Sequence, residues 1–160
     1  MDCRSISGRP SNLSFFKPFQ LFKGIQMNII KWDQKYSVGI ESIDVQHKQL
    51  FKMLSGFYER FQTDSQSAYD KLVDDAFKYV EYHFGYEETS FKRYGYDDTE
   101  AHIKEHKLFI NKLLDIKQRK KEGKPVLTME LTNYLKNWLV EHILGVDMKY
   151  SQFLRDKGMK

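Results

Sequence analysis

The chain of 160 residues contains one cysteine, three prolines and nine glycines. A single cysteine excludes an internal disulfide framework and any cysteine-based metal motif. It also fits a reducing compartment, so we expect a cytoplasmic protein. Few helix-breaking residues favour long helices. Strand and helix patterns do not alternate along the chain, which argues against a parallel sheet.

No apolar stretch reaches the roughly 20 residues that span a bilayer, so we predict no transmembrane segment. The sequence likewise lacks a clustered basic face, because residues 1–26 hold +3 of the net charge of +4. The one dense basic run, residues 117–121, falls where a helix is expected to end. We interpret its positive charges as stabilising the C-terminus of that helix. We therefore predict no nucleic-acid partner, and the sequence identifies no protein partner.

Residues 1–26 differ from the rest of the chain. Their aromatic segment is interrupted by Lys17, Pro18 and Lys23, which makes a poor signal-peptide core. We expect a disordered or non-native N-terminal extension. A short membrane-surface segment and a transit peptide are the alternatives, and Met27 is a candidate for the true start. Residues 27–160 form the predicted folded domain.

The folded domain shows a helical period throughout. An irregular arm, 28–39, precedes four stripes of apolar residues spaced three and four apart, and these stripes predict amphipathic helices. The predicted helices cover about 42–62, 68–93, 99–121 and 128–150. Gly95 is expected to end the second helix as a C-cap. Short loops between helices of this length indicate an all-α protein, an up-down-up-down four-helix bundle with an irregular N-terminal arm.

All five histidines fall inside the apolar stripes, and every predicted helix carries at least one: His47, His83, His102, His106 and His142. Two carboxylates accompany them. Glu87 lies four residues after His83, one turn along the same face. Asp147 lies five residues after His142, which predicts either a sideways reach of the carboxylate or a local π-type bulge near Gly145. Buried charges need partners or a metal, so this concentration predicts a metal centre inside the bundle.

The composition of the ligand set narrows the choice of metal. Seven ligands exceed the four that one zinc ion takes, and calcium and magnesium prefer oxygen. A mixture of imidazole and carboxylate suits iron, and bundle cores can hold paired iron ions. If both carboxylates and one solvent-derived oxygen bridge two octahedral irons, about eleven of twelve positions are filled. One position then stays open for a small molecule.

Several local motifs are similar to those of the hemerythrin family, in particular its single-domain bacterial type, the bacteriohemerythrins. The matching pieces are Trp32-Asp33, Tyr36-Ser-Val-Gly-Ile40, Asp44-Val-Gln-His47-Lys, His83-Phe-Gly-Tyr-Glu87-Glu88, His102-Ile-Lys-Glu-His106 and Trp138-Leu-Val-Glu-His142-Ile-Leu-Gly-Val-Asp147. The similarity covers about residues 27–153, and all seven candidate ligands occur in order.

The resemblance implies two iron ions joined by an oxo or hydroxo bridge. His102, His106 and His142 would hold one iron, and His47 and His83 the other. Glu87 and Asp147 would bridge both, and dioxygen would bind at the two-histidine iron. Leu50 and Leu139, each one turn from a histidine, would line an apolar oxygen pocket. We expect Glu88 to be a surface or supporting residue, and Trp138 and Tyr150 to pack rather than react.

These features predict a non-heme di-iron protein that binds dioxygen reversibly for storage, delivery or buffering, and that is not an enzyme. The alternative is a di-iron enzyme or sensor that handles peroxide, nitric oxide or iron. Oxygen-activating di-iron enzymes in bundles use more carboxylates and Glu-x-x-His pairs, whereas this set is rich in histidine. The sequence also points to no acid or base near the pocket beyond the ligands, and it encodes no output domain for a sensor.

Overall fold

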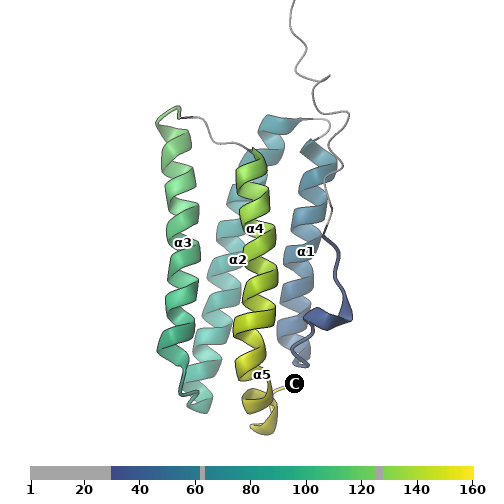
Figure 1. Cartoon of the computed structure of the whole chain (residues 1–160), viewed down its shortest axis with the longest axis vertical. Coiled ribbons are helices and arrows are strands. Elements are labelled where there is room, and N and C mark those ends of the chain that lie inside the picture. Colours follow the sequence, from purple (N-terminus) through teal and green to yellow (C-terminus); the bar gives the residue numbers. More distant parts are fainter. Residues whose placement is uncertain (1–29, 62–63, 125–127) are drawn as a thin grey trace, which may run out of the picture.

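The computed structural model describes residues 30–61, 64–124 and 128–160. Four long helices make up the molecule: α1 (Glu41–Phe61), α2 (Ser65–Tyr94), α3 (Thr99–Lys121) and α4 (Thr128–His142). Successive helices run in opposite directions side by side, and α5 (Met148–Asp156) continues the line of α4 at one end (Figure 1). The predicted up-down-up-down bundle is confirmed. Residues 1–26, for which an extension was predicted, lie outside the described residues.

One end of α2 agrees with its sequence signal, and its beginning differs. Gly95 closes α2 with a left-handed backbone, φ 71° and ψ 51°, as the C-cap prediction required. α2 begins at Ser65, three residues before the predicted start. The reason is that the Asp64 side chain accepts a hydrogen bond from the Ser67 N–H at 3.0 Å, which places the N-cap earlier in the loop.

The fourth predicted helix is divided in the structure. α4 ends at His142, and residues Ile143–Asp147 form a π-helical turn, η3, before α5 begins. Of the two alternatives predicted from the five-residue spacing of His142 and Asp147, a sideways reach or a π-type bulge, the bulge is present. Gly145, inside the turn, has no neighbouring atom within 4 Å of the position that a Cβ would take, so the turn is open on that side.

The N-terminal arm contains one turn of 3-10 helix, η2 (Gln34–Tyr36), and its residues 30, 37 and 38 make hydrogen bonds to the bundle. Asp44 of α1 accepts hydrogen bonds from the Ser37 hydroxyl at 2.5 Å and the Val38 N–H at 2.8 Å. The Arg155 guanidinium of α5 donates to the Val38 carbonyl. The arm thus joins the start of α1 to the C-terminal helix, at the end of the bundle that carries His47.

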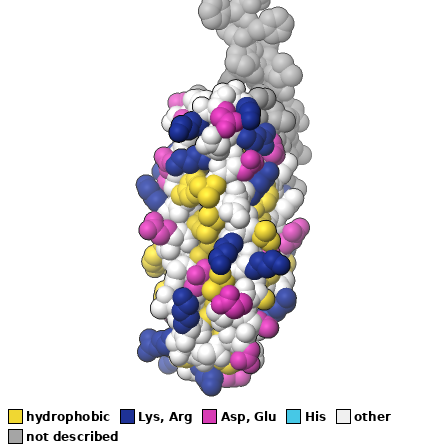
Figure 2. Space-filling model, turned by 90° about the vertical axis from the view of Figure 1, so that its left-hand side faces the viewer, with side chains coloured by type: hydrophobic (Ala, Val, Ile, Leu, Met, Phe, Trp, Pro, Cys, Tyr) yellow, Lys and Arg dark blue, Asp and Glu magenta, His cyan; other side chains and the backbone are white. Residues whose placement is uncertain are grey.

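The surface carries charges of both signs. Figure 2 shows the face on the left of Figure 1, where basic and acidic side chains flank apolar ones and no histidine is visible. Two residues of the basic run at the end of α3 form ion pairs: Arg119 lies 3.1 Å from Glu130, and Lys120 contacts Asp70. Among the described residues, no helix is both long enough and apolar enough to cross a membrane.

The two glycines of α2 are expected to respond oppositely to alanine. Gly95→Ala forces a side chain into the left-handed region and is expected to destabilise the metal-free protein by about 1 kcal/mol. Gly85→Ala lies in the helical interior with open space around its Cβ position, and it is expected to stabilise by roughly 0.5–1 kcal/mol. Urea unfolding followed by circular dichroism measures both. Equal effects would contradict the cap assignment.

Candidate metal centre

The seven predicted ligand side chains come from all four long helices and meet in the core. None of them is more than 4 % exposed, although each is polar or charged. His47 lies on α1, His83 and Glu87 on α2, His102 and His106 on α3, His142 at the end of α4, and Asp147 at the end of the π turn. The helical stripes turn them toward the interior, because residues three and four apart share a face, and the packing of the helices brings their donor atoms together.

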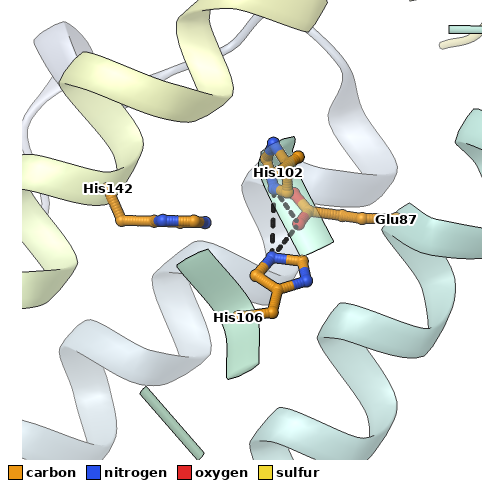
Figure 3. Close-up of side chains that lie close together, drawn as sticks. All are labelled: Glu87, His102, His106 and His142. Carbon is orange, nitrogen blue, oxygen red and sulfur yellow. Dashed lines mark hydrogen bonds and ion pairs between the residues drawn. The ribbon is translucent and has the colours of Figure 1, made fainter. Parts of the chain in front are cut away.

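Their donor atoms form two overlapping groups of four. One group contains His47, His83, Glu87 and Asp147, and the other contains Glu87, His102, His106 and His142. Within each group all donor atoms lie within 4.8 Å of one another. Figure 3 shows the second group, in which the side chains of α2, α3 and α4 converge. Two imidazoles thus gather on one side of the centre and three on the other.

Glu87 faces both groups with different oxygens. Its Oε1 lies 3.6 Å from His83 Nε2. Its Oε2 lies 3.3 Å from His102 Nε2 and 3.1 Å from His106 Nε2. One carboxylate oxygen therefore serves each side of the centre, which is the arrangement that a bridging carboxylate needs.

Asp147 divides its oxygens in the same way. Its Oδ2 lies 3.2 Å from His47 Nε2, while its Oδ1 lies 3.1 Å from His142 Nε2. The π turn makes this possible, because an α-helix would place a residue five positions on about 140° away from His142. Asp147 consequently lies between the two histidine groups together with Glu87.

Several polar atoms at the centre have no hydrogen-bond partner in the part of the chain that the structure describes, and this bears on whether the site fits a metal ion. Both nitrogens of His47, Nε2 of His142 and both oxygens of Asp147 are buried without a hydrogen-bond partner among the described residues. Leaving such atoms unsatisfied is costly. Two donor atoms bound at about 2.1 Å and at right angles to one ion are about 3 Å apart, close to the separations observed. The donor set therefore fits metal ions in the spacing of its atoms, and its His47, His142 and Asp147 atoms are available for a metal because they have no hydrogen-bond partner within the described structure.

The outer nitrogens of two histidines are held by acceptors. His83 Nδ1 lies 3.0 Å from Gln46 Oε1, and His106 Nδ1 lies 3.0 Å from Glu88 Oε1. Each acceptor keeps the proton on Nδ1, so that the lone pair of Nε2 points toward the centre. Glu88 therefore has the supporting role that was one of its two expected roles. Gln46 was missed by the sequence analysis, although its position directly before His47 could have suggested it.

Tyr150 contributes more than packing. It is fully buried, and its hydroxyl donates a hydrogen bond to Glu87 Oε1. Burial raises the pKa of Tyr150 well above its usual value, and the nearby Asp147 and Glu87 carboxylates add to the rise. The phenol thus stays protonated and remains a donor. Its spacing of three residues from Asp147 was the available signal, but the sequence does not tell which carboxylate it reaches.

The electrostatics of the centre favour the metal-binding protonation states of His83 and Glu87, whereas the lowering effect of burial on the pKa of His142 is outweighed by nearby carboxylates, first among them Asp147, which raise it. Burial lowers the pKa of His83 to about 3, which keeps its imidazole neutral. Burial opposes ionisation of Glu87, but the surrounding imidazoles, first among them His83, hold the pKa of Glu87 well below its usual range. Neutral imidazoles and ionised carboxylates are the forms that bind metals.

Apolar and aromatic side chains enclose the centre. The Phe84 ring stacks on His106 with centroids 3.6 Å apart, and the Trp138 ring stacks on His142 at 4.2 Å. Trp138 therefore packs, in agreement with its prediction. Leu50 and Leu139 are 2 % and 1 % exposed and belong to the core. Their role as lining of an oxygen pocket stays a prediction.

Removing the Tyr150 hydroxyl is expected to weaken the centre. Tyr150→Phe leaves Glu87 with one hydrogen bond fewer, and loss of such an outer partner typically lowers metal affinity by about 10–100-fold. Competition between the protein and a chelator for ferrous iron measures the change. Tyr96→Phe, which alters a ring 6.3 Å from that of Tyr150, is the control. Unchanged affinity in Tyr150→Phe would show that the hydrogen bond does not support metal binding.

Comparison with known proteins finds a matching family and several relatives. Residues 38–154 match the family described as the Hemerythrin HHE cation binding domain. The chain is 30% identical over 129 residues to the bacteriohemerythrin of Methylococcus capsulatus, an alignment that covers 80% of this chain and 98% of that protein. It is 32% identical over 124 residues to the bacteriohemerythrin of Pseudomonas aeruginosa, covering 78% and 80%.

Similarity extends to a eukaryotic relative and to solved structures. A hemerythrin-like protein of Naegleria gruberi is 32% identical over 123 residues, covering 77% of this chain and 92% of that protein. A crystal structure of wild-type hemerythrin superposes with a TM-score of 0.72 at 29% identity, covering 79% and 98%. With its four-helix bundle and its buried clusters suited to two metal ions, this chain belongs to the hemerythrin family of cation-binding proteins.

Proposed function

We propose that this protein is a non-heme di-iron protein that binds dioxygen reversibly and is not an enzyme. The single observation that carries the proposal is the pair of overlapping donor groups, which share Glu87 and divide five imidazoles into two and three. A pair of iron ions in these groups would supply reversible electron transfer to one dioxygen molecule. The family match and the bacteriohemerythrin relatives support this assignment.

The protein side chains have distinct roles in the proposal. His102, His106 and His142 would hold one iron, and His47 and His83 the other, which leaves the second ion with fewer protein ligands. Glu87 and Asp147 would connect the two, because each turns one oxygen toward each group. An oxo or hydroxo group would complete the ligand set. Because His47 and His83 leave their iron with fewer protein ligands, dioxygen would bind on that side.

The surroundings of the centre favour binding over turnover. The fully buried Leu50 and Leu139 exclude water from the proposed oxygen pocket. A dry pocket slows the entry of anions and water, which would displace the bound gas and leave the irons oxidised. Five neutral imidazoles against two carboxylates also stabilise the oxidised pair less than a carboxylate-rich set would. Both properties favour release of dioxygen as such.

Iron loading followed by exposure to air tests the proposal. Metal-free protein incubated with ferrous iron under anaerobic conditions is expected to bind two irons per chain. Air should then produce a visible charge-transfer band that disappears when oxygen is removed, over repeated cycles. One iron or one zinc per folded chain at saturation would contradict the di-iron centre. Irreversible bleaching with consumption of an added substrate would favour the enzyme alternative.

The two sides of the centre are expected to respond differently to loss of a histidine. His47→Ala removes one of two imidazoles from the open side, so oxygen binding should be abolished, with loss of iron from that side. His106→Ala removes one of three imidazoles and should retain metal while gaining a second position for an anion such as azide. Azide titration with iron quantification measures both. If His47→Ala still binds oxygen reversibly with two irons, the open side is assigned wrongly.

A further inference from the structure

Besides the candidate ligands, one polar side chain close to the centre, Tyr79, is buried without a hydrogen-bond partner among the described residues. Tyr79 of α2 is 8 % exposed, and its hydroxyl makes no hydrogen bond among the described residues. A phenol in the core normally finds an acceptor, because an unsatisfied donor away from water destabilises the folded state. The Tyr79 hydroxyl therefore has a free hydrogen-bonding capacity that the described fold does not use.

The position of Tyr79 connects it to the two-histidine side. It lies four residues before His83, and the two rings stack with centroids 4.9 Å apart and planes 29° from parallel. His83 belongs to the group with His47, the side with fewer protein ligands. The Tyr79 ring thus forms part of the wall of the centre on that side.

Helix directions bring Tyr79 to the same level as the two leucines of the proposed pocket. Leu50 follows His47 along α1, while Tyr79 and Leu139 precede their histidines along α2 and α4. Because α1 runs opposite to α2 and α4, all three lie one turn from the ligands toward the same end of the bundle (Figure 1). Tyr79 adds one hydroxyl to a layer that is otherwise apolar at these positions.

The Tyr79 hydroxyl is a donor under ordinary conditions. At neutral pH a phenol is protonated, so its oxygen carries one hydrogen that it can donate. A protonated phenol next to apolar side chains offers its hydrogen to a ligand that carries negative charge. At these positions the layer therefore holds one hydrogen-bond donor for a negatively charged ligand.

We infer that the Tyr79 hydroxyl donates a hydrogen bond to a small anion that enters at the His47–His83 side of the centre. Azide, cyanate and hydroxide have the size and charge that this donor would recognise. The inference rests on the proposed function, since it places the open side at His47 and His83. It adds one hydrogen-bond donor to a pocket described so far as purely apolar.

A purely structural role for the hydroxyl predicts a different outcome. If the Tyr79 ring only packs, phenylalanine retains the ring and removes an unsatisfied donor, so anion binding stays the same. If the hydroxyl binds the anion, phenylalanine weakens anion binding while the metal-free protein is as stable as before or more stable. The two readouts, anion affinity and thermal midpoint of the metal-free protein, therefore separate the two roles.

Tyr69 provides a matched control on the same helix. Tyr69 is 6 % exposed, and its hydroxyl also has no hydrogen-bond partner among the described residues. It lies ten residues before Tyr79, about 15 Å along the helix and away from the centre. Tyr69→Phe thus removes a comparable buried hydroxyl without touching the pocket.

Azide titration of the full-length, iron-loaded and oxidised protein tests the inference. Tyr79→Phe is expected to raise the azide Kd by about 10-fold or more, since a hydrogen bond to a charged group is lost. Tyr69→Phe should keep the Kd of the unmodified protein. The azide stretching frequency should shift in D₂O in the unmodified protein and in Tyr69→Phe, and this shift should be lost in Tyr79→Phe.

Each remaining outcome has a definite meaning. An unchanged Kd and an unchanged D₂O shift in Tyr79→Phe overturn the inference and leave the di-iron proposal intact. Equal weakening in both variants also overturns it, because the effect is then not specific to the pocket. If the unmodified protein fails to bind two irons, the proposed function itself fails, and iron analysis detects this before any azide is added.

Discussion

The burial of two carboxylates among five imidazoles is the constraint on which the structure depends. Glu87 and Asp147 are completely removed from solvent. In the protein interior an ionised carboxylate is stable only with compensating partners. Helix packing supplies these partners from four directions, and each carboxylate divides its oxygens between two groups of histidines. The core consequently has a polar layer whose stability is tied to cations, between apolar layers that pack without them.

The parts of the fold outside the centre restrict how that layer can move. Gln46 and Glu88 fix the outer nitrogens of His83 and His106, and Tyr150 holds one oxygen of Glu87. The arm and α5 are joined through Arg155 and Val38 at the same end of the bundle. Side chains that hold ligands in place reduce the reorganisation needed when metal binds, which is how outer partners raise metal affinity.

Much of this arrangement can be predicted from sequence periodicity. The remainder depends on the choice of helix caps and on contacts between helices, which periodicity does not determine. The apolar stripes located the four helices and aligned the histidines, and the five-residue spacing of His142 and Asp147 indicated the π turn. The start of α2 was misplaced because Asp64 and Ser67 are both suitable N-caps, and the loop geometry selects Asp64. The partners of Gln46 and Tyr150 were not predictable, since contacts between helices depend on their rotation and axial offset.

The π turn also sets the phase of everything that follows it. One additional residue in a helix rotates the later side chains by about 100° relative to the earlier ones. Leu135, Leu139 and His142 define the inward face before the turn, whereas Asp147, Tyr150 and Leu154 define it afterwards. The insertion that turns Asp147 toward the histidines thus also turns Tyr150 toward Glu87 and buries α5. The one additional residue of the π turn therefore sets both the position of Asp147 at the centre and the packing of α5. Removing it would rotate both together.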